Sequence, residues 1–439
     1  MSAQERPLGW FGIVRLGMVQ FAIGAIVMLA TSLLNRLMVG EYALAAAVPA
    51  GLVAWHYAVQ LSRPLWGHGS DRGRRRTPWI IAGMAMLAGG VMLAVSALEG
   101  LGQGTAAGYA LAIAAFAIIG AGVGAAGTSL LALLATRVAP ERRAAAAAIT
   151  WIMMIVGIVI TAQIAGRLID PFSLRRLTLV AGGVAGGAFL VALIGIAGIE
   201  GRRAPVVSAQ SPPGQSFGAA LREMLSEAEA RHFTAFVFCA MLAYSMQDLI
   251  LEPFAGLVFG MTPGESTQLS GTQHSGVLLG MILVGIGGSA FGGGTPHVLR
   301  RWIIGGCLGS ALALAGLGMA TQVGQAADWP LAANIWLLGF ANGVFAVAAI
   351  GAMMSMAGGA GPQREGIRMG VWGAAQAIAF GTGGLTGAVG VDVARALTGQ
   401  TEAAFAMVFA GEGALFLVAA WLAVGVGRGA ILRHREALA

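Results

Sequence analysis

The sequence predicts an all-α membrane protein of twelve transmembrane helices, arranged as two related six-helix halves. Of its 439 residues, 57% are hydrophobic and 10% are charged, whereas a soluble globular protein carries about 25% charged residues. Its 69 glycines are about twice the usual share, and small residues let helices pack closely within a bilayer. These observations together indicate an integral membrane protein.

Twelve windows of the chain have the length and apolar composition of a membrane span, which needs about 20 residues. Glycine dilutes the hydrophobicity of the eighth and ninth windows, so these two are the weakest. The windows cover residues 14–38, 42–62, 78–98, 108–135, 144–166, 177–198, 232–258, 273–293, 302–320, 329–355, 369–391 and 402–427.

The positive charge of the chain follows the connections between these windows. All 26 positively charged residues are arginine, and most fall on one side if both termini are cytoplasmic, as the positive-inside rule requires. Exceptions on the other side are Arg167, Arg175, Arg176 and Arg395. No aromatic residues are interleaved with the clusters, so a nucleic-acid partner is not expected. We predict an N-in/C-in topology.

A polar stretch divides the windows into an N-terminal half, residues 1–198, and a C-terminal half, residues 232–439. Between them, residues 199–231 begin as a Ser/Pro/Gln-rich linker and end in a short amphipathic helix on the cytoplasmic membrane surface. The halves look related, because Trp151 and Trp372 each follow a Pro and Arg sequence at nearly the same offset. Parallel repeats around a central cavity are a common transporter layout.

The stretch "YSMQDLILEPFAG", residues 244–256, places Asp248 and Glu252 one helical turn apart in an apolar window. A charge there costs at least about 2.5–3.5 kcal/mol on insertion scales, so a functional role is the first hypothesis. Two close carboxylates also disfavour each other's ionisation, so at least one is expected to hold a proton. Gln247 and Glu412 are further ligand candidates. The alternative is a structural network, for instance with an arginine.

Two polar groups stand out in the first half. His56 lies inside the second window, with Gln60 one turn later. A neutral imidazole there can ligate the magnesium of a chlorin ring or relay protons, and it can equally hydrogen-bond a neighbouring helix. At the outer end of the first window, Arg36 and Glu41 are expected to form an interfacial ion pair.

The loop "GHGSDRGRRR", residues 67–76, resembles the cytoplasmic loop signature of the major facilitator superfamily, with one spacer residue missing. Its aspartate can accept from a helix N-terminus or pair with an arginine, which would latch the halves in one access state. A plain positive-inside cluster is the alternative. The residues of this predicted conformational latch are Gly67, Ser70, Asp71, Arg72, Gly73, Arg74 and Arg75.

Three strings together resemble the PucC family, also called the bacteriochlorophyll delivery family, within the major facilitator superfamily. They are "SLLNRLMVGE", "HYAVQLSRPLWGHGSD" and "QDLILEPFAG", and the likeness runs through both halves. Phe254 departs from the pattern, since tyrosine is expected there. The resemblance lends weight to Asn35, Arg36, His56, Gln60, Arg63, Trp66, His68, Asp71, Gln247, Asp248, Glu252 and Pro253.

The resemblance implies a multi-pass protein of the photosynthetic, intracytoplasmic inner membrane of a bacterium. It implies that the protein binds and delivers, or shields, bacteriochlorophyll while antenna subunits are inserted. The expected partners are light-harvesting antenna polypeptides or a reaction-centre/antenna complex. His56, or a carboxylate acting through water, would contact the magnesium.

Two other hypotheses stay open. A proton-coupled transporter of a small amphiphilic substrate would use Asp248 and Glu252 as a proton relay, whereas a scaffold subunit of a photosynthetic complex would carry no pigment. No nucleophile–base pair or cofactor-binding loop stands out, and Cys239 and Cys307 fall in apolar windows. We therefore predict neither an enzyme nor a metal site of the protein itself.

Overall fold

The regular elements of the described chain are all helices, as the predicted fold class requires. The computed structural model describes residues 8–63, 66, 75–139, 142–200, 222, 226–290, 296–323, 329–358 and 362–425. Over these ranges no strand is present.

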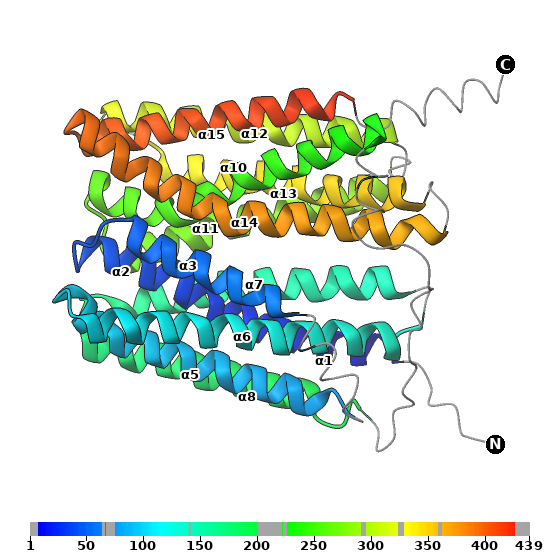
Figure 1. Cartoon of the computed structure of the whole chain (residues 1–439), viewed down its shortest axis with the longest axis horizontal. Coiled ribbons are helices and arrows are strands. Elements are labelled where there is room, and N and C mark those ends of the chain that lie inside the picture. The colour runs from blue at the N-terminus through cyan, green and yellow to red at the C-terminus, as the bar shows by residue number, and fades with distance from the viewer. Residues whose placement is uncertain are drawn as a thin grey trace. The chain divides into compact units, whose positions relative to one another are not determined.

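The first half contains a continuous helix with a π-helical turn, followed by five further helices (Figure 1). The continuous helix consists of α1 (Trp10–Met28), the turn Leu29–Leu33 and α2 (Leu34–Gly40). The others are α3 (Ala47–Val59), α5 (Thr77–Gly102), α6 (Ala106–Arg137), α7 (Arg143–Ile169) and α8 (Leu174–Ile196).

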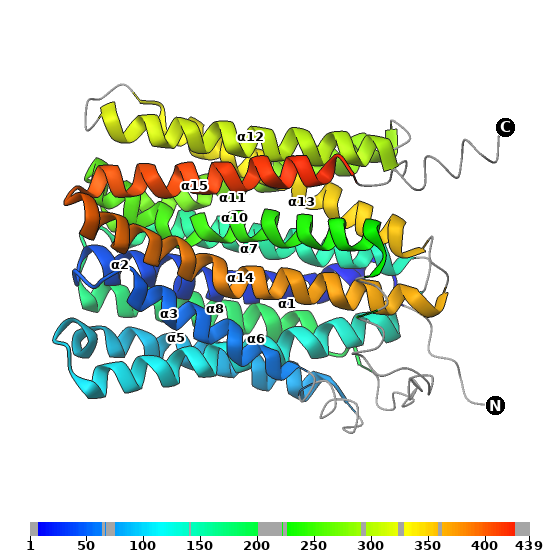
Figure 2. The same cartoon turned by 45° about the horizontal axis from the view of Figure 1, so that its top comes forward.

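The second half contains six long helices, which are coloured green to red in Figures 1 and 2. They are α10 (Ala228–Phe259), α11 (Pro263–Ala290), α12 (Pro296–Val323), α13 (Leu331–Gly358), α14 (Pro362–Thr398) and α15 (Thr401–Ala423).

Ten helical stretches in the described part of the chain are long and apolar enough to cross a membrane. The two other predicted spans, 42–62 and 273–293, correspond to α3 and α11, which are helical but fall short of that measure. α3 has only 13 residues, since its helix begins at Ala47 rather than at residue 42. α11 has 28 residues but begins ten residues earlier than predicted, and its serine, threonine and glutamine side chains lower its hydropathy.

The chain forms two compact units. The first comprises Met1–Gln210 and Met261–Gly271, and the second comprises Ser211–Gly260 and Thr272–Ala439. The beginning of α11 therefore belongs with the first unit, although the sequence division assigned all of 232–439 to the second half. The boundaries of the halves at 198 and 231 stay predictions.

In the first unit, α1 packs on α7 and α8, and α5 packs on α6 and α8. Glycine makes this close packing possible. A Cβ on Gly157 of α7 would come within 2.2 Å of the Phe21 carbonyl oxygen of α1. Gly24 of α1 approaches the Met154 carbonyl oxygen of α7 in the same way, at 2.4 Å. Such backbone contacts are what small residues provide between membrane helices.

In the second unit, α10 packs on α14 and α15, and α12 packs on α13 and α15. Trp372 of α14 is fully buried; its Nε1 donates to Thr234 Oγ1 of α10 over 3.1 Å, and its ring lies 4.9 Å from that of Phe233. Trp151, at the matching sequence offset in the first half, is 42% exposed. The similarity of the two tryptophan positions therefore does not extend to their burial.

Candidate functional site

The acids singled out in the sequence lie on α10, which continues through Pro253 as a helix. Glu252 is 3% exposed and has an interaction within the protein. Asp248 is half-buried, and its Oδ1 is buried with no hydrogen-bond partner among the described residues. The two acids of this helix therefore have different surroundings, although they are only one turn apart.

The structure directs Asp248 of α10 and Glu412 of α15 into one region, because aromatic residues one turn away on the two helices, Tyr244 and Phe416, both contact Phe345. Glu412 has no exposed surface, and neither of its oxygens has a hydrogen-bond partner among the described residues. The sequence analysis paired Asp248 with Glu252 because both lie on one helix. It named Glu412 as a separate candidate, since nothing in a sequence shows that residues 164 positions apart, 248 and 412, come together.

An aromatic cluster, which we call the Tyr244 layer, shows which region of the second unit these acid side chains face. The ring of Tyr244 on α10 lies 6.3 Å from that of Phe345 on α13 and 5.6 Å from that of Phe380 on α14. Phe345 in turn lies 5.5 Å from Phe416 on α15. The rings of four helices therefore meet at one level of the second unit.

One helical turn beyond this layer lies a polar layer of Asp248, Asn342 and Glu412. Asp248 is four residues after Tyr244, Asn342 is three residues before Phe345, and Glu412 is four residues before Phe416. Residues three or four apart share a helix face. Because the aromatic rings touch, the three polar side chains are directed into the same region.

A second aromatic cluster, the Phe254 layer, closes the polar layer on its other side. The ring of Phe254 on α10 lies 4.9 Å from that of Phe409 and 5.4 Å from that of Phe405, both on α15. All three phenylalanines are buried, with at most 1% exposed. Along α10 and α15 alike, the acid lies between the two aromatic layers.

Neutral polar side chains complete the site. Ser310 Oγ of α12 donates to Asn342 Oδ1 over 2.8 Å, while the Asn342 amide nitrogen has no partner among the described residues. Gln247 of α10 is also fully buried, and neither of its amide atoms is paired with a described residue. The site therefore offers hydrogen-bond donors and acceptors, and two carboxyl groups, inside an aromatic enclosure.

His56 of α3 is 2% exposed, and its Nε2 lies 2.8 Å from Gln60 Nε2, which donates to it. Gln60 Oε1 accepts from Arg63 Nη2. The other ring nitrogen, Nδ1, is buried without a described partner. α6 covers the same turn closely, since a Cβ on Gly120 would lie 2.5 Å from the His56 carbonyl oxygen. A buried ring with an occupied Nε2 does not fit a magnesium ligand in this conformation.

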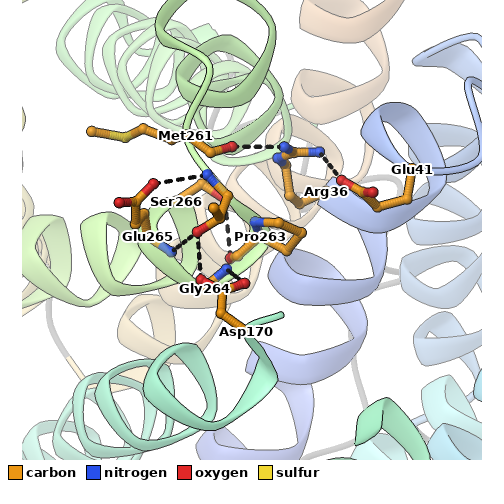
Figure 3. A network of polar contacts seen from close by, with 9 residues as sticks. Arg36, Glu41, Asp170, Met261, Pro263, Gly264, Glu265 and Ser266 are labelled. Atoms are coloured by element: carbon orange, nitrogen blue, oxygen red, sulfur yellow. Dashed lines mark hydrogen bonds and ion pairs between the residues drawn. The ribbon is translucent and has the colours of Figure 1, made fainter. Parts of the chain in front are cut away.

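The structure also brings Arg36 and Glu41 together, at the end of α2 (Figure 3). Arg36 is 4% exposed, and its Nη1 lies 3.6 Å from Glu41 Oε1. Its Nη2 donates over 3.0 Å to the carbonyl oxygen of Met261, in the segment that precedes α11. Gly40 makes room for the guanidinium, because a Cβ there would lie 1.4 Å from Arg36 Nη1.

Asp170, which the sequence analysis did not select, joins α7 to the same segment (Figure 3). Its Oδ1 accepts from the Gly264 amide over 3.1 Å, and its Oδ2 accepts from Thr262 Oγ1. Thr262 and Glu265 form a capping box, in which each side chain accepts from the other's backbone amide at 2.9 and 3.1 Å. The string "TPGE" is a recognisable sequence signal for this cap. No sequence signal indicates that Asp170 contacts it.

Most of the predicted conformational latch, residues 67 and 70–74, lies outside the described residues, and Arg75 is exposed. Next to it, Glu200 accepts from the backbone amides of Arg76 and Thr77, each at 2.8 Å. A carboxylate at a helix N-terminus is favourable, so Glu200 stabilises the start of α5. Nothing in the sequence pairs Glu200 with this helix, because Glu200 lies more than 120 residues after Arg76 along the chain.

Two solved structures are similar to this chain over almost its full length. The peptide transporter POT in complex with sulfate has a TM-score of 0.69 at 14% identity, covering 96% of each chain. A bacterial homologue of the human lysosomal transporter Spinster, in its inward-facing unoccupied form, has a TM-score of 0.67 at 15% identity, covering 95% of each chain. The chain is a multi-pass membrane protein with the major facilitator fold.

The family described as PUCC protein matches residues 33–431, and the chain belongs to that family. The "Bacteriochlorophyll synthase 44.5 kDa chain" of Rhodobacter capsulatus is 49% identical over 419 residues, covering 95% of this chain and 96% of the relative. "Protein PucC" of Cereibacter sphaeroides is 32% identical over 385 residues, covering 84% and 81%. These findings confirm the family resemblance seen in the sequence.

Proposed function

We propose that this protein binds bacteriochlorophyll and delivers or shields it while light-harvesting antenna subunits are inserted into the photosynthetic inner membrane. The observation that carries the proposal is the full-length likeness, at 49% identity, to a relative whose name refers to bacteriochlorophyll. Its partners would be antenna polypeptides or a reaction-centre/antenna complex. The name of that relative contains the word synthase. We propose that this chain holds the pigment and does not itself catalyse its synthesis.

The polar layer of the second unit is the proposed contact with the pigment. Bacteriochlorophyll presents a magnesium ion, ring carbonyl groups and an apolar tail, and magnesium prefers oxygen ligands. Asp248 is the half-buried member of the layer, so it is the acid that a ligand or its magnesium-bound water can reach. Asn342 and Gln247 retain unpaired amide atoms for carbonyl groups. Glu252 and Glu412 would support Asp248 from either side.

His56 and Gln60 take a different part in this proposal. Because Gln60 occupies the Nε2 of a buried His56 ring, the pair would order the end of α3, which α6 covers at Gly120, rather than ligate magnesium. The carboxylate acting through water is thus the favoured magnesium contact. The latch residues 67 and 70–75 and the Arg36–Glu41 pair would act on conformation, away from the pigment.

A second candidate function is proton-coupled transport of a small amphiphilic substrate. The likeness in fold to transporters favours it, as does the placement of Asp248 and Glu412 in one polar layer. A scaffold subunit without pigment is the third hypothesis. The three differ in whether pigment binds and whether protons cross the membrane.

Purification of the full-length chain in mild detergent from a bacterium that makes bacteriochlorophyll tests the proposal. We expect bacteriochlorophyll to co-purify at a fixed molar ratio, and antenna polypeptides to be found with it. Asp248→Asn combined with Glu412→Gln should reduce the bound pigment several-fold. The matched control is Glu402→Gln, since Glu402 is an exposed acid in the first turn of α15, and it should retain the pigment.

A folded wild-type chain that yields no pigment, and binds none when pigment is added, would contradict the proposal. Antenna polypeptides that still co-purify in that case would support the scaffold. Proton uptake driven by a substrate in liposomes, again without pigment, would support the transporter.

A further inference from the structure

We propose that Asp248 and Glu412 form a proton-binding site of the second unit, in which the two carboxyl groups share one proton at neutral pH. This site goes beyond the proposed pigment role, because it exists whether or not any pigment binds. It also differs from the relay considered in the sequence, since the second acid is Glu412 of α15 and not Glu252 of α10.

Glu412 has no counter-charge among its described neighbours. The carboxyl group is fully buried and lacks a described hydrogen-bond partner, and the ring contacts one turn away direct the acid Asp248 into the same region. An unpaired carboxylate in apolar surroundings costs several kcal/mol, and a second one nearby adds repulsion. One proton removes both costs.

The ionisable groups of the surrounding helices do not supply the missing cation. The groups of α10 within one turn of Asp248 are Tyr244 and Glu252, and α12 has the buried thiol of Cys307 one turn before Ser310. The cations of these helices lie farther along them: Arg231 and His232 are at least 16 residues before Asp248, and His297, Arg300 and Arg301 are at least nine residues before Ser310. The described residues of α13 include no ionisable side chain. None of the groups of α10, α12 and α13 within one turn of the polar layer is a cation that would neutralise a carboxylate.

α14 carries one cation on its described side chains, Arg395, together with Asp392. α14 meets α15 where a Cβ on Gly390 would lie 3.3 Å from Val408. Arg395 follows Gly390 on α14, whereas Glu412 follows Val408 on α15, and the two helices run in opposite directions. Arg395 and Glu412 therefore lie on opposite sides of that contact. Asp392, which is also beyond it, adds no positive charge.

The neutral side chains of the polar layer suit a pair that carries one negative charge. Asn342 is fully buried, is held by Ser310 through Oδ1, and keeps an unpaired N–H donor. An amide donor stabilises the remaining carboxylate of a singly protonated pair, but it cannot compensate two charges. Asn342 is thus a second observation, independent of the acids, that indicates a site for one proton.

The two acids differ in burial, and this difference determines which of them exchanges protons with water. Asp248 is half-buried and Glu412 is sealed, so a proton from water reaches the Asp248 carboxylate first and is then shared with Glu412. Glu412 alone, in the absence of the Asp248 acid, would keep its proton because no solvent reaches it. Asp248 alone would hold its proton less firmly than Glu412 because it is only half-buried, although its Oδ1 is enclosed without a described partner.

An infrared pH titration of the pigment-free, full-length protein in lipid nanodiscs tests this asymmetry. The readout is the carbonyl stretch of a protonated carboxylic acid. At neutral pH we expect that band in the wild type and in Asp248→Asn, a weaker band in Glu412→Gln, and its loss in the double variant. Glu402→Gln, the exposed acid on the same helix, should leave the band unchanged.

A wild type without a protonated-acid band at neutral pH would overturn the proposal, and this result needs no variant. A band of equal size in the two single variants would also overturn it, as would a band that persists in the double variant and so belongs to another acid such as Glu252. Because the sample contains no pigment, these outcomes are separate from success or failure of the pigment-binding experiment.

Discussion

Glu412 lies in the middle of α15 with both carboxyl oxygens buried and unpaired among the described residues. An ionised side chain at this position would be among the most costly groups in the second unit, because Glu412 has no exposed surface and no hydrogen-bond partner among the described residues. The residue is tolerable in the folded chain when it is neutral. The stability of the second unit should therefore depend on whether the Asp248–Glu412 pair holds its proton.

This dependence has a definite sign. The folded pair retains a proton that the solvent-exposed acids of the unfolded chain have released, so the unfolded state binds fewer protons and the free energy of unfolding falls as pH rises. We expect the unfolding midpoint of the wild type to decrease from neutral to alkaline pH. The Asp248→Asn/Glu412→Gln protein should show a flatter dependence, and equal slopes for the two proteins would contradict the account.

Trp372 offers a second test at the residue scale. Replacement by phenylalanine removes the donor to Thr234 and leaves space in a buried site, which should cost about 1–3 kcal/mol of unfolding free energy. Trp151→Phe is the matched control, and at its 42% exposed position the change should stay within about 0.5 kcal/mol. Urea or thermal unfolding in detergent measures both, and equal losses would refute the assigned difference in burial.

At the scale of elements, the beginning of α11 is held by the first unit through several contacts. Asp170 accepts from Gly264 and Thr262, Gln163 Nε2 of α7 donates to the Gln268 carbonyl oxygen over 3.0 Å, and Ser32 Oγ donates to Ser270 Oγ over 3.1 Å. Such polar residues are tolerated in an apolar protein because each finds a partner.

Asp170→Ala should therefore loosen this end of α11. The loss of two hydrogen bonds to a carboxylate at a helix N-terminus is expected to lower the local opening free energy by about 1–3 kcal/mol. Hydrogen exchange of the Gly264 and Glu265 amides measures it, and exchange should accelerate by about 5- to 150-fold. Glu402→Ala provides a control at an exposed acid. Unchanged exchange in the Asp170 variant would show that the other contacts suffice.

The packing of α1 on α7 gives a test that does not involve polar groups. Leucine at Gly157 would collide with the Phe21 backbone, since even a Cβ would lie 2.2 Å away, and overpacking of this kind costs about 1–3 kcal/mol or more. Gly183 of α8 has open space around its Cβ position and should accept leucine. The unfolding midpoints of the two variants measure this difference, and we expect the lower midpoint for the Gly157 variant. Equal midpoints would argue against the α1–α7 contact.

The helices were predictable where composition alone determines them. Long apolar windows predicted ten of the spans. The predicted start of α11 was too late, because its first turns contain polar residues such as Ser266 and Thr267, which lower the mean hydropathy although they are buried. The site was predictable only in part. Asp248 stood out as an acid in an apolar window, but its partner Glu412, and the links made by Asp170 and Glu200, depend on contacts between distant segments that a single sequence does not reveal.

At the scale of the whole molecule, the chain has a fold similar to that of solved transporters. Its family includes relatives named for bacteriochlorophyll and PucC. Each unit has its own helix packing, and the second contains a polar layer enclosed by aromatic rings. This organisation suits a protein that receives an amphiphilic ligand within the membrane. The central claim is that the ligand is bacteriochlorophyll and that the protein passes it to antenna polypeptides.

The most direct test is a transfer measurement. Purified chain loaded with bacteriochlorophyll is mixed with pigment-free antenna polypeptides in nanodiscs, and the absorbance of the assembled antenna is followed over time. We predict that antenna pigment appears several-fold faster than from free pigment at the same concentration, and that the Asp248→Asn/Glu412→Gln protein gives no acceleration while Glu402→Gln does. Antenna assembly at the same rate with and without the chain would contradict the account.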